Sequence, residues 1–124
     1  MTNPVALIIE DDLNLATIYA EALRMAEFET EIVHDGQTAL ARLTVTTPTV
    51  VLLDLHLPYV SGQTILQQIR ADKRLAKTRV LLATADSLKA ESLQGEADLV
   101  LLKPISFHQL RDLAKRLRPP DLMG

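Results

Sequence analysis

Acidic residues follow two apolar runs of this 124-residue sequence. The run 6–9 leads into three consecutive acids, residues 10–12, and the run 50–53 is closed by Asp54. A carboxylate at the end of a buried strand destabilises the fold unless its charge is compensated, so the presence of these acids requires a structural or functional explanation. Capping of the following helix or turn is one reason, but three acids together exceed what a helix N-terminus requires. We therefore interpret some of them as functional.

Two later apolar runs end in a hydroxyl and an amine. Thr84 follows the run 80–83, and Lys103 follows the run 99–102. If these runs are parallel strands, their carboxyl ends lie at one edge of the sheet, where open α/β folds bind ligands. Neighbouring strands are ~4.8 Å apart, and two carboxylates at about 5 Å repel by roughly 3 kcal/mol at an effective dielectric constant of about 20. Acids that end adjacent strands therefore need a counterion.

A divalent cation removes this repulsion. An all-oxygen site with few protein ligands and room for water suits Mg²⁺, and nothing favours zinc. Glu10, Asp11 and Asp54 carry three negative charges, which one Mg²⁺ and Lys103 neutralise. With the Thr84 hydroxyl beside it, such a site is equipped for phosphoryl transfer, because metal and amine neutralise phosphoryl oxygens while a carboxylate attacks. The sequence has no Gly-rich phosphate loop, so a nucleotide is not the expected donor.

The elements that must position these groups alternate between strand and helix. Strands are expected at 5–9, 29–33, 49–53, 80–84 and 99–102, with helical spacing of apolar residues within 15–26, 39–43, 65–69, 88–93 and 107–117. Four of the five strands are continuous apolar runs, which predicts a parallel sheet with helices on both faces, a doubly wound single-domain α/β fold. Gly36 follows the second strand, in a turn where glycine can adopt a positive φ.

Composition limits the class of protein further. A chain of 124 residues can bury one core without disulfides or a structural metal, and the absence of cysteine removes thiolate chemistry. The net charge of −3 gives no electrostatic case for nucleic-acid binding by this domain. No apolar run approaches the length needed to cross a bilayer. The first basic residue is Arg24, so the start of the sequence does not show the positively charged region that is typical of a signal peptide. We expect a cytoplasmic protein with no membrane partner.

Several short motifs, each weak alone, occur together in a specific order and spacing. They are Ile8–Asp12, His34–Gly36 with Ala39-Leu40, Asp54 with Pro58 and Gly62, Thr84-Ala85, and Lys103-Pro104. In this combination the sequence resembles the receiver domain of two-component response regulators, over essentially the whole chain. The resemblance implies a flavodoxin-like five-stranded sheet of order 2-1-3-4-5. We expect the receiver domain to cover residues 1–118. Pro119-Pro120 stops the last helix, so residues 119–124 are expected to form a C-terminal tail.

The resemblance assigns the acidic residues. Asp54 matches the phosphoacceptor, which receives a phosphoryl group from a histidine kinase or a histidine phosphotransfer protein and becomes an aspartyl phosphate. Asp11 and Asp54 match direct ligands of Mg²⁺, together with the backbone carbonyl of His56. Glu10 matches the acid that binds the metal mostly through water, which leaves Asp12 as a helix cap.

The resemblance also assigns the amine and the hydroxyl. Lys103 matches the residue that pairs with the phosphoryl oxygens, and the Lys103–Pro104 peptide is expected to be cis. Thr84 matches the residue that hydrogen-bonds the phosphoryl group and so reports its presence. The last two helices and the fifth strand match the usual self-association face of the family, which allows a homodimer. The sequence specifies neither the cognate kinase nor an output domain, and it fits either a stand-alone regulator or a fragment.

The sequence departs from the family pattern at residue 100. Most receivers have Tyr or Phe three residues before the lysine, and the ring swings inward when the threonine moves; here the residue is Val100. We therefore expect the signal to leave through backbone shifts of the loops after Thr84 and Asp54, with weak signalling as the alternative. Arg79 replaces a proline that often precedes the fourth strand, which is a lesser change.

Three interpretations of the site remain open from the sequence. The leading one is a phosphoacceptor switch that turns over no separate substrate. The second is a Mg²⁺-dependent phosphatase with Asp54 as nucleophile, which commonly has a second Asp where this chain has His56. The third is a pseudo-receiver interaction module, which Val100 keeps open. His56 and Asp86 border the path of the attacking water in the family, and they are either loop residues or residues that tune the lifetime of the acyl phosphate.

Overall fold

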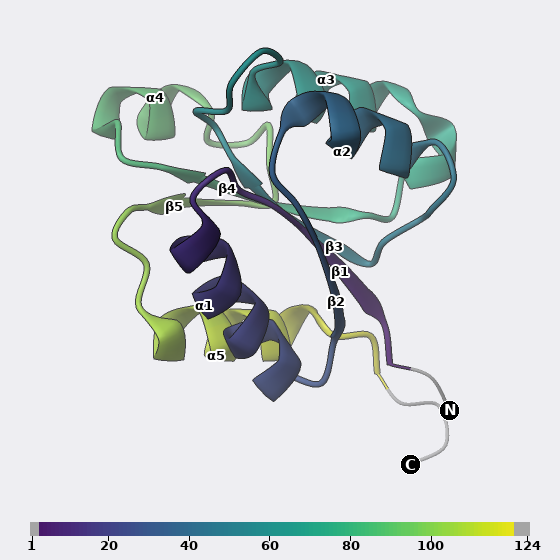
Figure 1. Cartoon of the computed structure of the whole chain (residues 1–124), viewed down its shortest axis with the longest axis vertical. Helices are drawn as coiled ribbons and strands as arrows, with labels where there is room; N and C mark the ends of the chain where they lie inside the picture. The colour runs from purple at the N-terminus through teal and green to yellow at the C-terminus, as the bar shows by residue number, and fades with distance from the viewer. Residues whose placement is uncertain (1–2, 121–124) are drawn as a thin grey trace.

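The computed structural model describes residues 3–120 and contains one five-stranded parallel sheet (Figure 1). The strands are β1 (Val5–Ile9), β2 (Glu29–Val33), β3 (Val50–Asp54), β4 (Arg79–Thr84) and β5 (Leu99–Leu102). Their order is β2-β1-β3-β4-β5, which confirms the expected order, and their bounds agree with the expected ones to within one residue. Each strand except β2 is apolar on both faces, because helices cover both sides of the sheet.

Helices pack on both faces of this sheet (Figure 1). One face carries α1 (Leu13–Met25) and α5 (Phe107–Leu117), and the other carries α2 (Gly36–Leu43), α3 (Gly62–Ala71) and α4 (Ser87–Ser92). Alternate strand residues fill two separate cores: Ile8 and Leu52 face α1 and α5, whereas Ile9 and Leu53 face α2 and α3. A short 3₁₀ helix, Lys73–Leu75, which the periodicity did not predict, follows α3.

Each α-helix begins at a residue whose side chain accepts a hydrogen bond from the first turn. The five N-caps are Asp12, Asp35, Ser61, Asp86 and Ser106. Such caps satisfy backbone N–H groups that have no partner within the helix. Asp12 accepts from the Leu15 amide at 3.0 Å, which confirms its expected capping role. All five caps lie between a strand and the helix that follows it, at the carboxyl edge of the sheet.

Glycine is required at two positions by close packing rather than by backbone conformation. The expected positive φ at Gly36 is wrong, because among the described glycines only Gly95 has one. A Cβ at Gly36 would lie 2.7 Å from the Cβ of Val60. A Cβ at Gly62 would overlap the Asp54 carbonyl oxygen and lie 2.7 Å from the Cα of Leu55. Gly62 therefore lets α3 begin directly against the end of β3.

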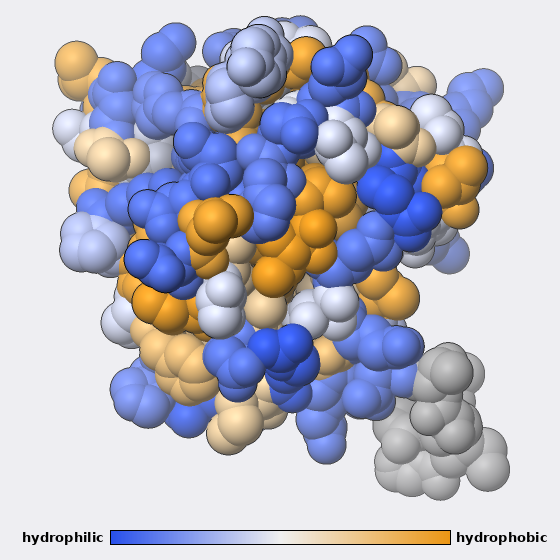
Figure 2. Space-filling model, viewed as in Figure 1, coloured by the Kyte–Doolittle hydropathy of each residue, from blue (hydrophilic) through white to orange (hydrophobic). Residues whose placement is uncertain are grey.

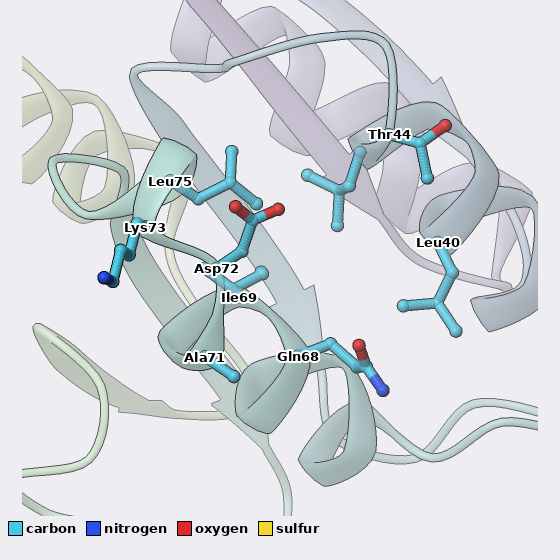
Figure 3. A pocket seen from close by; sticks show the side chains of 9 residues that line it. Leu40, Thr44, Gln68, Ile69, Ala71, Asp72, Lys73 and Leu75 are labelled. Carbon is cyan, nitrogen blue, oxygen red and sulfur yellow. The ribbon is translucent and has the colours of Figure 1, made fainter.

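A groove of about 360 Å³ lies between the carboxyl-terminal ends of α2 and α3. Figure 3 shows Leu40 and Thr44 on one side and Gln68 and Asp72 on the other. In a parallel α/β fold the carboxyl-terminal ends of the helices lie at the amino-terminal edge of the sheet. The groove is therefore on the opposite side of the molecule from the acids that the sequence singles out.

The surface and the ends of the chain complete the fold. Figure 2 shows apolar side chains in the middle of one face, between the two helical layers and surrounded by hydrophilic ones. β2 lies at the edge of the sheet and is partly exposed, which explains why its sequence has only a weak apolar pattern.

Over residues 3–120, no helix has both the length and the apolar character required to span a membrane. Of the expected tail 119–124, residues 121–124 lie outside the described part of the chain.

Candidate functional site

The carboxyl ends of β1 and β3 bring three acids together. Leu53 pairs with Ile9, so the next residues, Asp54 and Glu10, lie side by side beyond the paired segment. The carboxylates of Glu10, Asp11 and Asp54 offer oxygen atoms that all lie within 4.8 Å of one another. Glu10 and Asp54 are buried, at 2% and 4% exposure, whereas Asp11 is exposed. The cluster that the sequence predicts is therefore present, with one member open to water.

Lys103 reaches this cluster from the end of β5. Its Nζ lies 2.9 Å from Glu10 Oε1 and 3.4 Å from Asp54 Oδ1. The Lys103 backbone amide donates to the Thr84 carbonyl at 2.8 Å, which extends the ladder between β4 and β5. The Lys103–Pro104 peptide is cis, as expected. The ammonium group therefore lies between two carboxylates that are 44 residues apart in the sequence.

The electrostatics of the cluster follow from burial and from the mixture of charges. Burial raises the pKa of Glu10 to about 7, although its hydrogen bonds from Lys103 and from the Asp12 amide lower it. Burial lowers the pKa of Lys103, but its hydrogen bond to Glu10 and the charge of Asp54 outweigh that effect and raise the pKa above its ordinary value. The amine therefore stays protonated, and one ammonium does not balance three acids.

The donor set fits Mg²⁺. The three clustered side chains offer only carboxylate oxygens, which hard divalent cations prefer, and the exposed Asp11 leaves space for water ligands. The His56 backbone adjoins the cluster, because its amide donates to Asp54 Oδ1 at 3.1 Å. A bound cation would supply the positive charge that Lys103 alone does not provide.

Thr84 also lies at this edge, at the end of β4, and it is fully buried. Its Oγ1 accepts a hydrogen bond from the Asp86 amide at 3.0 Å. The same oxygen lies 3.2 Å from His56 Nε2, within hydrogen-bond distance. Sequence reasoning left the His56 imidazole without a partner, because the direction of a side chain in an irregular loop has no periodic signal.

Residue 100 of β5, two positions before the residue that pairs with Thr84, is a valine. Val100 pairs with Leu82 and packs on the core that faces α2 and α3. Tyr19, a residue of α1, is buried in the opposite core, and Tyr59 is 94% exposed in the loop before α3. Residue 100 therefore has no aromatic ring that could swing inward, as the sequence indicated.

Comparison with known proteins identifies the family. Residues 6–115 match the model of the response regulator receiver domain. The chain is 37% identical over 112 residues to the sensory transduction protein RegX3 of Mycolicibacterium smegmatis, covering 90% of this chain and 48% of that protein. It is 34% identical over 110 residues to RpaA of Synechocystis, a DNA-binding dual master transcriptional regulator, covering 86% of this chain and 46% of that protein. The chain therefore belongs to the response regulator receiver domain family, and it spans about half the length of these relatives.

Solved structures agree with this assignment. The bacteriophytochrome response regulator RtBRR is similar with a TM-score of 0.81 and 26% identity, covering 100% of this chain and 84% of that one. The chemotaxis response regulator CheY4 of Vibrio cholerae shares the fold, with a TM-score of 0.83 at 21% identity over 94% of this chain and 99% of that one. The receiver domain of the Pseudomonas aeruginosa kinase PA1611 shares the fold at 24% identity, with a TM-score of 0.83 over 94% of this chain and 98% of that one. That structure contains a magnesium ion in its active-site cleft.

Proposed function

We propose that this chain works in the cytoplasm as a phosphorylation-controlled receiver, and that Asp54 accepts the phosphoryl group in a Mg²⁺-dependent reaction. The donor is a phosphohistidine on a histidine kinase or a histidine phosphotransfer protein. The observation that carries the proposal is the position of Lys103 Nζ, 2.9 Å from Glu10 and 3.4 Å from Asp54 within a cluster of three acids. Membership of the receiver family supports the same conclusion.

The residues have distinct roles in this reaction. A carboxylate oxygen of Asp54 attacks phosphorus and forms an acyl phosphate, while the P–N bond of the donor breaks and its electron pair returns to the imidazole. Lys103 approaches the Asp54 carboxylate closely enough to neutralise a phosphoryl oxygen attached to it. Thr84, at the end of β4 on the same edge of the sheet, then donates a hydrogen bond to the phosphoryl group. We assign Asp11, Asp54 and the His56 carbonyl as the ligands of Mg²⁺, with Glu10 acting through water.

The role of the metal is electrostatic. When bound, Mg²⁺ supplies positive charge that offsets the phosphoryl oxygens and the clustered carboxylates. The chain is a receiver rather than a classical enzyme with its own substrate. Its formation and loss of the acyl phosphate are self-catalysed in this proposal, because the groups that polarise the phosphoryl oxygens belong to the same chain.

Incubation with acetyl phosphate and Mg²⁺, followed by intact-protein mass measurement, tests the proposal. We expect one acid-stable, base-labile phosphoryl group, which is absent when EDTA replaces Mg²⁺ and absent in Asp54→Asn. Asp112→Asn, an exposed acid on α5, is the matched control and should behave as wild type. Catalytic release of phosphate over many turnovers would instead support the phosphatase. No modification at all would support the pseudo-receiver.

We also propose a homodimer through α4, β5 and α5. Leu88 on α4 is 76% exposed and Leu102 at the end of β5 is 51% exposed, so this surface presents apolar side chains to solvent. Burial of such side chains in a contact between two copies would stabilise the contact. Sedimentation velocity with and without the phosphoryl analogue beryllofluoride tests this, with Leu88→Glu expected to abolish dimers. A chain that remains monomeric at all concentrations in both states would contradict it.

A further inference from the structure

The hydroxyl of Thr84 has a partner that the receiver reaction does not use. Besides the Asp86 amide at 3.0 Å, it contacts Nε2 of His56 at 3.2 Å. Thr84 is fully buried, whereas His56 is exposed. The imidazole can therefore leave this contact and enter water without opening the core, but the threonine cannot leave its position at the end of β4.

We propose that the His56 side chain is a positioning residue that holds the Thr84 hydroxyl in the unphosphorylated chain and is displaced when that hydroxyl binds the phosphoryl group. This inference rests on the proposed phosphorylation of Asp54. A hydroxyl has one proton, and phosphoryl oxygens only accept hydrogen bonds. A Thr84 proton donated to the imidazole is therefore unavailable to the phosphoryl group. If Nε2 carries the proton instead, the contact still fixes the direction in which the hydroxyl points.

A second contact links His56 to the phosphoacceptor itself. Its backbone amide donates to Asp54 Oδ1 at 3.1 Å, while its side chain contacts Thr84. Formation of an acyl phosphate changes the charge and the geometry at the acceptor of that amide bond. One residue thus contacts both the group that is modified and the group that reports the modification. This arrangement provides a movable side chain in a domain that has Val100 where the usual aromatic ring would be.

The expected size of the effect follows from the strength of one hydrogen bond. A typical intramolecular hydrogen bond changes an equilibrium by about 2- to 12-fold. Removal of the His56 contact frees Thr84 and should therefore increase the affinity for a phosphoryl analogue by about 2- to 12-fold. The effect requires the Thr84 hydroxyl, so it should disappear when that hydroxyl is absent. A role of His56 in excluding the attacking water would not depend on Thr84.

Titration with beryllofluoride in excess Mg²⁺, observed by the amide resonances of Thr84 and Ala85, tests the inference. His56→Leu should bind the analogue about 2- to 12-fold more tightly than wild type, and His56→Gln, which can still bond to the hydroxyl, should stay near wild type. His108→Leu, an exposed histidine on α5, is the matched control and should not change the affinity. In the Thr84→Ala background, His56→Leu should have no further effect.

The outcomes separate this inference from the proposed function. Equal affinities of wild type and His56→Leu, or the same increase in the Thr84→Ala background, would overturn the positioning role while leaving phosphorylation of Asp54 intact. A wild-type chain that gains no phosphoryl group from acetyl phosphate and binds no beryllofluoride would overturn both.

Discussion

The substitution Gly62→Ala tests how tightly the fold positions the phosphoacceptor. A Cβ at this residue would overlap the Asp54 carbonyl and lie 2.7 Å from the Cα of Leu55, whereas ordinary contacts begin near 3.4 Å. The end of β3 must therefore move by at least about 0.7 Å. Overlap with backbone atoms typically costs about 1–3 kcal/mol, and it exceeds the gain in helix propensity at the first residue of α3, which is at most about 1 kcal/mol.

Two measurements follow from this displacement. A loss of about 2 kcal/mol lowers the midpoint of urea unfolding by about 1 M for a slope of about 2 kcal/mol/M. Because a shift of about 1 Å at a reacting group can cost roughly 100-fold in rate, we expect phosphorylation by acetyl phosphate to slow by about 10- to 100-fold. Gln67→Ala, an exposed position on the same helix, should change neither quantity. Wild-type stability and rate in Gly62→Ala would refute the close-packing explanation.

Three further predictions concern the acids. Mg²⁺ at ten times its dissociation constant should raise the free energy of unfolding of wild type by about 1.4 kcal/mol, and that of Asp11→Asn much less. Equal shifts of the melting temperature in the two proteins would contradict the assignment of Asp11 as a ligand of Mg²⁺. In EDTA, Glu10 has a higher pKa in the folded chain than in the unfolded chain, so protonation of Glu10 favours folding. This stabilisation is complete below about pH 4.5 and is lost as the pH rises through about 7. Glu10→Gln should flatten that profile, and an unchanged slope in urea titrations would contradict it. Asp98→Ala removes acceptors for the Val80 amide at 2.7 Å and Arg70 at 2.8 Å, so it should cost about 1–3 kcal/mol of unfolding free energy; a loss below about 0.5 kcal/mol would refute this.

The strand pattern was predictable because buried parallel strands leave continuous apolar runs. The runs ending at Ile9, Leu53 and Leu102 placed the acids and the lysine at one edge, and the structure brings Lys103 to within 3.4 Å of Asp54 there. The expected third strand ended one residue early, since Asp54 itself still pairs with Ala83. A polar residue within the hydrogen-bonded ladder looks like a loop residue when only hydropathy is considered.

Other features depended on packing between distant segments, which leaves no periodic trace. Gly36 was assigned a conformational role, but its contact with Val60 in the loop before α3 is what excludes a side chain. The hydrogen bond between His56 and Thr84 joins a loop to the end of β4, 28 residues further along the chain. Arg79, seen in the sequence only as a missing proline, forms an ion pair with Asp98 across the start of β4. Such contacts follow from the folded geometry and not from local residue type.

A crystal structure of the chain with Mg²⁺ and beryllofluoride tests the central claim most directly. The account predicts one metal ion at about 2.0–2.1 Å from oxygens of Asp11, Asp54 and the His56 carbonyl, with beryllofluoride on the Asp54 carboxylate facing Lys103 and Thr84. Beryllofluoride on another side chain, or a metal ion bound away from the three clustered acids, would contradict the account.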